Sequence, residues 1–238
     1  MRCLERAQAP DGGFPERLGG LGLGAARTRD VWAVKYYLDA ALVRVRTAFE
    51  ARWQDFPDRI DPEDGRVQAV RRWCEKLPPG ARVADVGCGR GRFLRHLVQW
   101  FPGARFTGID ISPAMLAQLP PGVTPLEGSL LEVPLADAAL DGAFAVESLE
   151  HALLPQQAVA ELCRIVRPGG RVLVIDKDRR KQALSEHDPW ERWFAPEELA
   201  RWLGRWCQRV TVSRVSHTEG RPGRSLFLAA AGTRRGAD

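Results

Sequence analysis

Paired cysteines are missing from this sequence. Its five cysteines, Cys3, Cys74, Cys88, Cys163 and Cys207, are odd in number and form no C-x-x-C pair. This pattern predicts neither a disulfide framework nor a zinc site. Free thiols fit a reducing compartment, which we expect to be the cytoplasm.

Long apolar runs are also missing. No stretch approaches the length of a membrane-spanning helix, and the N-terminal residues show no apolar core of a signal peptide. We therefore predict no membrane span. With 238 residues, of which 45% are hydrophobic and 27% charged, the chain is long enough for one globular α/β domain with additions.

The excess of positive charge is small and dispersed. The formal net charge is +5, and the basic residues lie along the whole chain, with one short cluster at Arg179-Arg180-Lys181. A nucleic-acid-binding protein usually concentrates such residues on one face. RNA binding therefore stays an alternative and is not the main prediction.

The most informative stretch reads RVADVGCGRGRFLRHL, from Arg82 to Leu97. Its apolar, β-branched start predicts a buried strand, and its end has the apolar spacing of a helix. The glycines between them, Gly87, Gly89 and Gly91, allow a sharp turn that brings the backbone close to a ligand. A strand, a glycine turn and a helix predict the first unit of a Rossmann-like sheet.

The spacing differs from the G-x-G-x-x-G turn of dinucleotide-binding proteins. Here Asp85 precedes a G-x-G-x-G turn, and this arrangement resembles motif I of class I S-adenosylmethionine-dependent methyltransferases. Three later segments resemble the same family at the expected spacing: Asp110 with Ile111–Leu116, Glu127–Phe144, and Glu161–Ile175. The resemblance covers roughly residues 66–176, and its motifs are close to those of the ubiquinone and menaquinone biosynthesis methyltransferases.

The resemblance implies an α/β fold: a seven-stranded, mostly parallel Rossmann-like sheet with helices on both faces and an antiparallel last strand. We expect a disordered glycine-rich leader at 1–29, an N-terminal helical lid at 30–65 and the S-adenosylmethionine-binding domain at 66–232. Residues 177–195 are expected to form the loop on the substrate side.

The resemblance also implies which residues bind the cofactor. The glycine turn would cradle its amino-acid part and ribose, Asp110 would accept from the ribose hydroxyls, and Ile111 and Ser129 would contact the adenine. Most relatives have an acid where Ser129 stands, so this contact is expected to be weaker. The complete predicted set is Asp85, Gly87, Cys88, Gly89, Gly91, Asp110, Ile111, Met115, Gly128, Ser129, Leu130 and Glu147.

His151 is the predicted catalytic residue. It ends the stretch E-S-L-E-H (Glu147–His151), which directly follows the predicted fourth strand, where ligands bind in such sheets. An imidazole there could take a proton from a phenol or an amine during methyl transfer. In some relatives the acids and the histidine hold a divalent metal, and a purely structural role is open too. We predict no metal.

Aromatic and basic residues are candidates for the substrate side. Trp190, Trp193 and Phe194 offer flat apolar surface and Lys177 offers charge, which suits an aromatic or acidic small molecule. Tyr36 and Tyr37 would reach the substrate from the lid. Packing of a helix on the sheet explains the tyrosines equally well. For the tryptophan-rich patch, structural packing is slightly favoured over substrate binding.

We therefore predict methyl transfer from S-adenosylmethionine, giving S-adenosylhomocysteine, to an oxygen, nitrogen or carbon atom of a small molecule. The expected partner is that acceptor, with nucleic acid disfavoured and a homodimer compatible with the sequence. The alternatives are an RNA base methyltransferase and a non-catalytic protein that binds S-adenosylmethionine.

Overall fold

The computed structural model describes residues 41–184, 191–218 and 226–236. The predicted leader at 1–29, both tyrosines of the predicted lid (Tyr36 and Tyr37) and Trp190 lie outside the described residues. Among the described residues, no helix is both long and apolar enough to cross a membrane.

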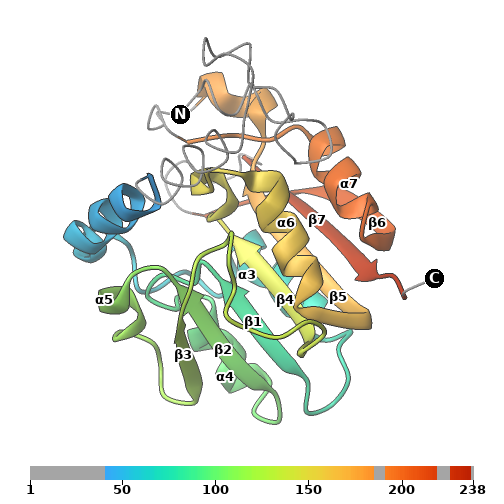
Figure 1. Cartoon of the computed structure of the whole chain (residues 1–238), viewed down its shortest axis with the longest axis horizontal. Coiled ribbons are helices and arrows are strands. Elements are labelled where there is room, and N and C mark those ends of the chain that lie inside the picture. Colours follow the sequence, from blue (N-terminus) through green and yellow to red (C-terminus); the bar gives the residue numbers. More distant parts are fainter. Residues whose placement is uncertain (1–40, 185–190, 219–225, 237–238) are drawn as a thin grey trace, which may run out of the picture.

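One seven-stranded sheet organises the described part of the chain, in the order β3-β2-β1-β4-β5-β7-β6 (Figure 1). The strands β3, β2, β1, β4 and β5 pair in parallel, whereas β7 is antiparallel to both of its neighbours, β5 and β6. This arrangement confirms the predicted fold, including the antiparallel last strand. The strands are β1 (Arg82–Val86), β2 (Arg105–Asp110), β3 (Val123–Glu127), β4 (Leu140–Val146), β5 (Val166–Lys177), β6 (Cys207–Val215) and β7 (Phe227–Arg234).

Helices cover both faces of the sheet. The α-helices are α3 (Gly65–Cys74), α4 (Leu94–Trp100), α5 (Pro113–Leu116), α6 (Pro155–Arg164) and α7 (Pro196–Gly204). The described residues also form the short 3-10 helices η2 (Trp53–Asp55), η3 (Leu149–His151) and η4 (Arg179–Leu184). The short α5 begins as the sequence indicates, because the Ser112 hydroxyl accepts a hydrogen bond from the Met115 N–H and Pro113 occupies the first helical position.

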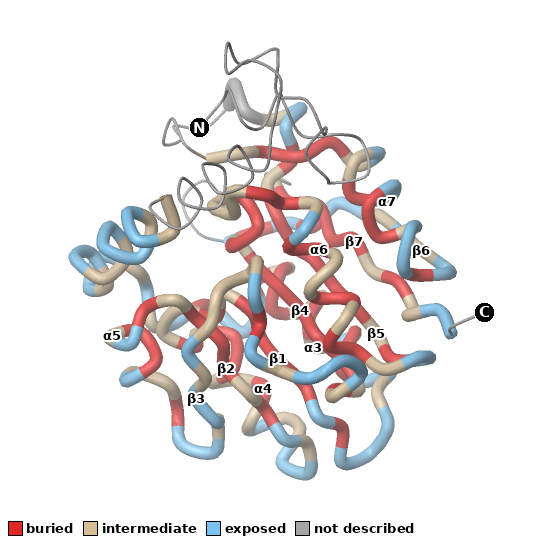
Figure 2. The backbone as a smooth tube through the Cα atoms, viewed as in Figure 1, coloured by how far each residue is buried: buried red, intermediate tan, exposed pale blue. Residues whose placement is uncertain are grey.

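The central strands bury side chains on both faces, so the core has two halves. Along β5, Val172 and Val174 face the half covered by α6 and α7, whereas Leu173 and Ile175 face the half that contains α3 and α4. This alternation follows from the two-residue repeat of a strand. Figure 2 shows the buried residues concentrated on the central strands, while the edge strand β3 is largely unburied.

A helical segment at residues 41–51 lies beside α5 at the edge where the parallel strands end (Figure 1). The Glu50 carboxylate accepts hydrogen bonds from the Ser112 hydroxyl and the Ala114 N–H, and Arg46 forms an ion pair of 2.8 Å with Glu127. These contacts connect the segment to the ends of β2 and β3. It therefore covers the edge of the sheet at which a ligand would bind.

Candidate functional site

A cavity lies at the carboxyl ends of β1, β2 and β4, beneath residues 41–51. This is the point where the strand order reverses from β1 to β4, which is the usual ligand crevice of an open α/β sheet. Every predicted cofactor residue except Gly91 lines it, and so does the predicted catalytic residue His151. The lining positions from that prediction are Asp85, Gly87, Cys88, Gly89, Asp110, Ile111, Met115, Gly128, Ser129, Leu130 and Glu147.

Two glycines of the turn have different tasks. Gly87 has φ +80°, and a Cβ there would lie 2.4 Å from the Cβ of Ser148, whose hydroxyl donates to the Val86 carbonyl over 3.0 Å. Gly87 thus lets the turn pass close to the segment after β4. Gly91 has φ +76°, and a Cβ there would meet Leu119 at 2.6 Å. Its absence from the cavity lining therefore reflects a packing role.

Asp110, at the tip of β2, is hydrogen-bonded to the glycine turn. Its carboxylate accepts from the Gly89 N–H over 2.7 Å and from the Ser112 N–H over 3.0 Å. Burial raises the pKa of this carboxyl above its usual value, although these hydrogen bonds act in the opposite direction and favour the charged form. Each oxygen keeps acceptor capacity, so a diol in the cavity could donate to it.

Asp85 has a buried carboxylate oxygen without a hydrogen-bond partner among the described residues. The side chain lines the cavity at 1% exposure, and its Oδ2 is the unsatisfied atom. Burial raises the pKa of Asp85 well above its usual value, and the nearby Asp110 adds to the effect. A buried acceptor without a donor is costly, so this atom is a natural partner for a donor group of a ligand.

Glu147 faces the cavity from a strained backbone position directly after β4. Its φ is +51°, a conformation that non-glycine residues seldom adopt and that often marks functional sites. Its carboxylate oxygen Oε1 lies 2.6 Å from Arg66 Nη1 and 2.5 Å from Arg92 Nη2. Two arginines, one from α3 and one from the turn before α4, therefore hold this side chain in position.

Arg66 is almost completely buried, at 1% exposure, and Asp64 fixes its orientation. The two oxygens of Asp64 accept from Nε and Nη2 of Arg66 over 2.9 and 3.0 Å, and one of them also accepts from the Thr218 N–H. The guanidinium lies over the ring of Phe227, 4.6 Å from its centroid. Asp64 thus orients the guanidinium whose Nη1 donates to Glu147 over 2.6 Å.

The predicted adenine side is formed by the segment after β3. A Cβ at Gly128 would lie 2.4 Å from the ring of Pro134, so this backbone is held closely against its neighbour. The Ser129 hydroxyl accepts from the Leu131 N–H over 2.9 Å, which fixes the turn at the cavity wall. Ser129 thus offers a hydroxyl where most relatives have an acid, and this hydroxyl already accepts a hydrogen bond from the backbone.

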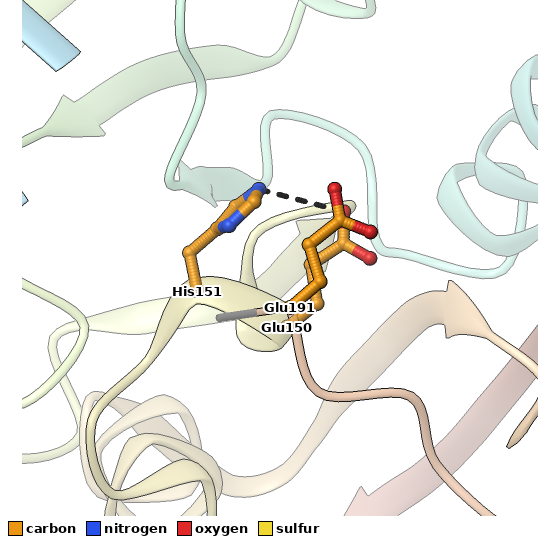
Figure 3. Close-up of side chains that lie close together, drawn as sticks. All are labelled: Glu150, His151 and Glu191. Atoms are coloured by element: carbon orange, nitrogen blue, oxygen red, sulfur yellow. Dashed lines mark ion pairs between the residues drawn. The ribbon is translucent and has the colours of Figure 1, made fainter. Parts of the chain in front are cut away.

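His151 lies at the end of η3 and belongs to a compact group of charged side chains (Figure 3). Its Nε2 is 3.5 Å from Glu150 Oε1, and its ring meets the ring of Phe49 edge-on with centroids 5.2 Å apart. Glu150, His151 and Glu191 each place one possible metal-ligand atom within 4.8 Å of the others. The ammonium of Lys177 forms ion pairs with both acids of this group, 3.1 Å from Glu150 and 2.8 Å from Glu191.

Three predicted substrate residues of the loop at 177–195 are described by the structure, and none of them lines the cavity: Lys177, Trp193 and Phe194. Phe194 is fully buried in the core, where its ring meets Trp202 edge-on at 5.8 Å, and Trp193 is 3% exposed. Lys177 makes ion pairs with Glu150 and Glu191. The structure thus gives these three residues packing and ion-pair contacts in place of the cavity contacts expected from the sequence.

The arginines of the basic cluster after β5 are ion-paired. Arg179 lies 3.4 Å from Glu198, and Arg180 lies 3.4 Å from Asp178 and 3.8 Å from Glu197. Acidic residues therefore already neutralise much of this charge, which weakens the alternative of an RNA-binding patch.

Several cavity residues were not predicted from the sequence. Leu42, Val45 and Phe49 reach the cavity from the segment 41–51, and Phe56 and Arg92 also line it. The apolar spacing of 42, 45 and 49 is a helical signal that was available in the sequence. Nothing local indicated the contact between Arg66 and Glu147, which are 81 residues apart.

The strand order, the glycine turn and the acid at the tip of β2 together define a nucleotide-cofactor-binding α/β domain. Residues 84–174 match the family of methyltransferase domains. The matched region spans the motifs that resemble those of class I S-adenosylmethionine-dependent methyltransferases.

Two curated relatives and one solved structure show what the chain is similar to. A 2-methyl-6-phytyl-1,4-hydroquinone methyltransferase from Synechocystis sp. is 34% identical over 61% of this chain and 48% of its own length. An S-adenosyl-L-methionine-dependent Diels-Alderase from Talaromyces variabilis is 32% identical over 56% of this chain and 48% of its own length. A SAM-dependent methyltransferase from Thermotoga maritima has a TM-score of 0.57 at 25% identity, covering 72% of this chain and 88% of that one. The chain thus spans about half the length of these curated relatives.

The cavity residues fit S-adenosylmethionine chemically. The cofactor carries an ammonium, a diol and an adenine, and the cavity offers the unsatisfied Asp85 oxygen, the Asp110 carboxylate and the side chains of Ile111 and Met115. The side chains that reach the cavity from residues 41–51 are apolar: Leu42, Val45 and Phe49. Acidic and apolar groups in one cavity suit a charged cofactor beside an apolar acceptor.

Proposed function

We propose that this chain transfers a methyl group from S-adenosylmethionine to an apolar, aromatic small molecule. The observation that carries the proposal is the cavity lining, which combines the predicted cofactor positions and His151 with the apolar side chains of Leu42, Val45 and Phe49. The ring of Phe49 meets that of His151 with centroids 5.2 Å apart. When bound, S-adenosylmethionine supplies an electrophilic methyl group on a sulfonium. The protein's task is then to align the acceptor with that methyl group and to exclude water.

We propose distinct roles for the cavity residues. The turn at Gly87 and Gly89 holds the amino-acid part of the cofactor, Asp110 accepts from the ribose hydroxyls, and Ile111 contacts the adenine. Asp85 accepts from the ammonium, because its Oδ2 is a buried acceptor in need of a donor. His151 takes the proton of an acceptor hydroxyl or amine.

The acceptor class is inferred from the lid side of the cavity. Leucine, valine and phenylalanine side chains there favour an apolar molecule, and the Synechocystis relative is named for a hydroquinone substrate. A phenol or hydroquinone therefore fits better than the acidic molecule that the basic loop suggested, since Lys177 is held by Glu150 and Glu191.

Other parts of the prediction remain proposals. We retain the division into a leader (1–29), a lid (30–65) and a methyltransferase domain (66–232), as well as a cytoplasmic location and a homodimer. The location rests on the described cysteines, which are unpaired: Cys74, Cys88, Cys163 and Cys207.

The test is a transfer assay with S-adenosylmethionine that carries a tritiated methyl group. The purified chain is incubated with separate panels of hydroquinones and phenols, aliphatic amines, carboxylic acids and transfer RNA. Label in the hydroquinone and phenol panel supports the proposal. Label in RNA alone, or tight cofactor binding without label in any panel, would contradict it.

A further inference from the structure

A chain of polar contacts leads from the cavity to the segment before α7. Nε1 of Trp193 donates to Glu191 Oε2 over 3.1 Å, and Lys177 Nζ lies 2.8 Å from the same oxygen. The ammonium also lies 3.1 Å from Glu150 Oε2, and the other oxygen of Glu150 is 3.5 Å from His151 Nε2. Residues from three separate parts of the chain thus converge on His151, as the side chains labelled in Figure 3 indicate for Glu150 and Glu191.

In this series of polar contacts, burial affects the ionisation of Glu150. The side chain is 3% exposed, and its backbone N–H donates to Asp176, itself fully buried. Burial raises the pKa of Glu150 well above its usual value, and the nearby acids Asp176, Glu191 and Glu147 add to the rise. Lys177 acts against it and favours the carboxylate. Burial thus disfavours the charged form of Glu150, and Lys177 is the neighbour that favours it.

The two carboxylates in turn stabilise the charged form of Lys177. Burial alone would lower its pKa, but Glu150 and Glu191 outweigh burial and raise it above the usual value. The ammonium is thus charged and divided between two carboxylates. Glu191 keeps it at the cluster from one side, and the Trp193 indole fixes Glu191.

The position of Lys177 argues against a metal site at these residues. Glu150, His151 and Glu191 have suitable ligand atoms within 4.8 Å of one another, but the ammonium already lies at both carboxylates. A divalent cation at these oxygens would have to displace a buried positive charge. When both acids are ionised, the two carboxylates and the ammonium together carry one net negative charge, which a protonated His151 would neutralise.

We propose that Glu150 is a positioning residue that orients His151 and stabilises its protonated form, and that Lys177, held by Glu191, favours the carboxylate form of Glu150 for this task. This inference rests on the proposed function of His151 as the base. In that step the heteroatom–hydrogen bond of the acceptor breaks and the imidazole takes the proton. The electron pair left on the heteroatom forms the bond to the methyl carbon, and the pair of the broken carbon–sulfur bond stays on sulfur.

The first test follows the imidazole directly and needs no methyl transfer. The full chain is labelled with ¹³C-histidine, the His151 signal is assigned with a His151→Asn variant, and the signal is titrated by NMR. In Glu150→Gln, which keeps the side-chain volume, we expect the titration midpoint of His151 to fall by about one pH unit. In Glu191→Gln we expect a smaller fall in the same direction. Glu197→Gln, at an exposed acid of α7, is the matched control and should leave the midpoint unchanged.

The second test relates this shift to turnover. In Glu150→Gln the rising limb of the kcat–pH profile should move by the same amount as the imidazole midpoint, with the KM for S-adenosylmethionine unchanged. An unmoved His151 midpoint in Glu150→Gln overturns the inference, even if the protein methylates its acceptor. A shifted midpoint in a wild-type protein that transfers no methyl group supports the inference about the cluster and contradicts the proposed function.

A metal titration completes the design. Mn²⁺ added to the wild-type protein is followed by the electron paramagnetic resonance signal of the free ion. We expect no stoichiometric loss of that signal. A one-to-one loss that Glu191→Gln abolishes would show that the cluster is a metal site and would overturn the proposal.

Discussion

The Asp110 carboxylate and the Gly89 N–H are joined by a hydrogen bond of 2.7 Å. This contact links the tip of β2 to the glycine turn after β1, so the two elements that would hold the cofactor are fixed relative to each other. Asp110 is 9% exposed and lines the cavity, and its carboxylate keeps lone pairs that can accept from a ligand. It can therefore act both as a structural acceptor and as a ligand for a ribose diol.

Replacing this carboxylate should weaken cofactor binding strongly. We expect Asp110→Ala to raise the dissociation constant of S-adenosylhomocysteine at least tenfold, or about 1.4 kcal/mol, because two charge-assisted hydrogen bonds are lost. Isothermal titration calorimetry measures the change. The control is Asp137→Ala, an exposed acid paired with Arg164 away from the cavity, which should bind like the wild type. Unchanged affinity in Asp110→Ala would refute the ribose assignment.

The close approach at Gly87 gives a second prediction, for which Gly122 is the control position. Both glycines have positive φ, +80° and +88°, but a Cβ at Gly87 meets Ser148 at 2.4 Å, whereas nothing lies within 4 Å of a Cβ at Gly122. Gly122→Ala should cost about 1 kcal/mol of unfolding free energy for the backbone conformation alone. Gly87→Ala should cost at least about 2 kcal/mol more because of overpacking, and should weaken cofactor binding. Equal costs in urea denaturation would exclude the steric explanation.

His151 should affect turnover and leave cofactor binding largely intact. Its ring lines the cavity beside Phe49, and its loss removes the proposed proton acceptor. We expect His151→Ala to lower kcat roughly a hundredfold, within the range for general bases, with a similar dissociation constant for S-adenosylhomocysteine. His96→Ala, on α4, is the control. If His151→Ala retains full turnover across the pH range, the residue is structural.

Asp64 should make the fold sensitive to acid. Burial alone would raise its pKa, but hydrogen bonds from Arg66 and Thr218 outweigh burial and lower it from 3.8 to about 2. Below the unfolded-state value the unfolded chain binds more protons than the native one, so this stabilisation is complete above about pH 4 and is lost as the pH falls toward 2. The difference corresponds to about 2 kcal/mol.

Asp64→Asn should therefore destabilise the protein near neutral pH and lose less additional stability in acid than the wild type. Urea denaturation at about pH 6 and about pH 3 measures both unfolding free energies. The gap between variant and wild type should narrow at the lower pH. A gap that stays constant would mean that Asp64 has the same pKa in both states.

Local sequence signals predicted most of the fold. β-branched runs such as Val172–Ile175 indicated buried strands, and the motif from Asp85 to Gly91 indicated the glycine turn. The structure confirms the mostly parallel seven-stranded sheet that the family resemblance implies. One strand is longer than its apolar run indicates: β5 begins at Val166, which pairs with Leu140 across an irregularity in the register.

The parts of the site that could not be predicted depend on contacts between distant residues. Glu147 was expected to contact the cofactor, but its ion pair with Arg66 joins residues 81 positions apart. Phe194 was expected at the substrate, yet periodicity does not distinguish a buried aromatic side chain from one that lines a cavity. Lys177 has the right charge for an acidic substrate, and only the fold shows that Glu150 and Glu191 already bind it.

The most direct measurement of the central claim is a calorimetric titration of the purified chain with S-adenosylmethionine and with S-adenosylhomocysteine. The account predicts that both bind at one site with micromolar dissociation constants, and that Asp110→Ala loses both. Absence of binding to either compound by the folded wild-type chain would contradict the assignment of the cavity.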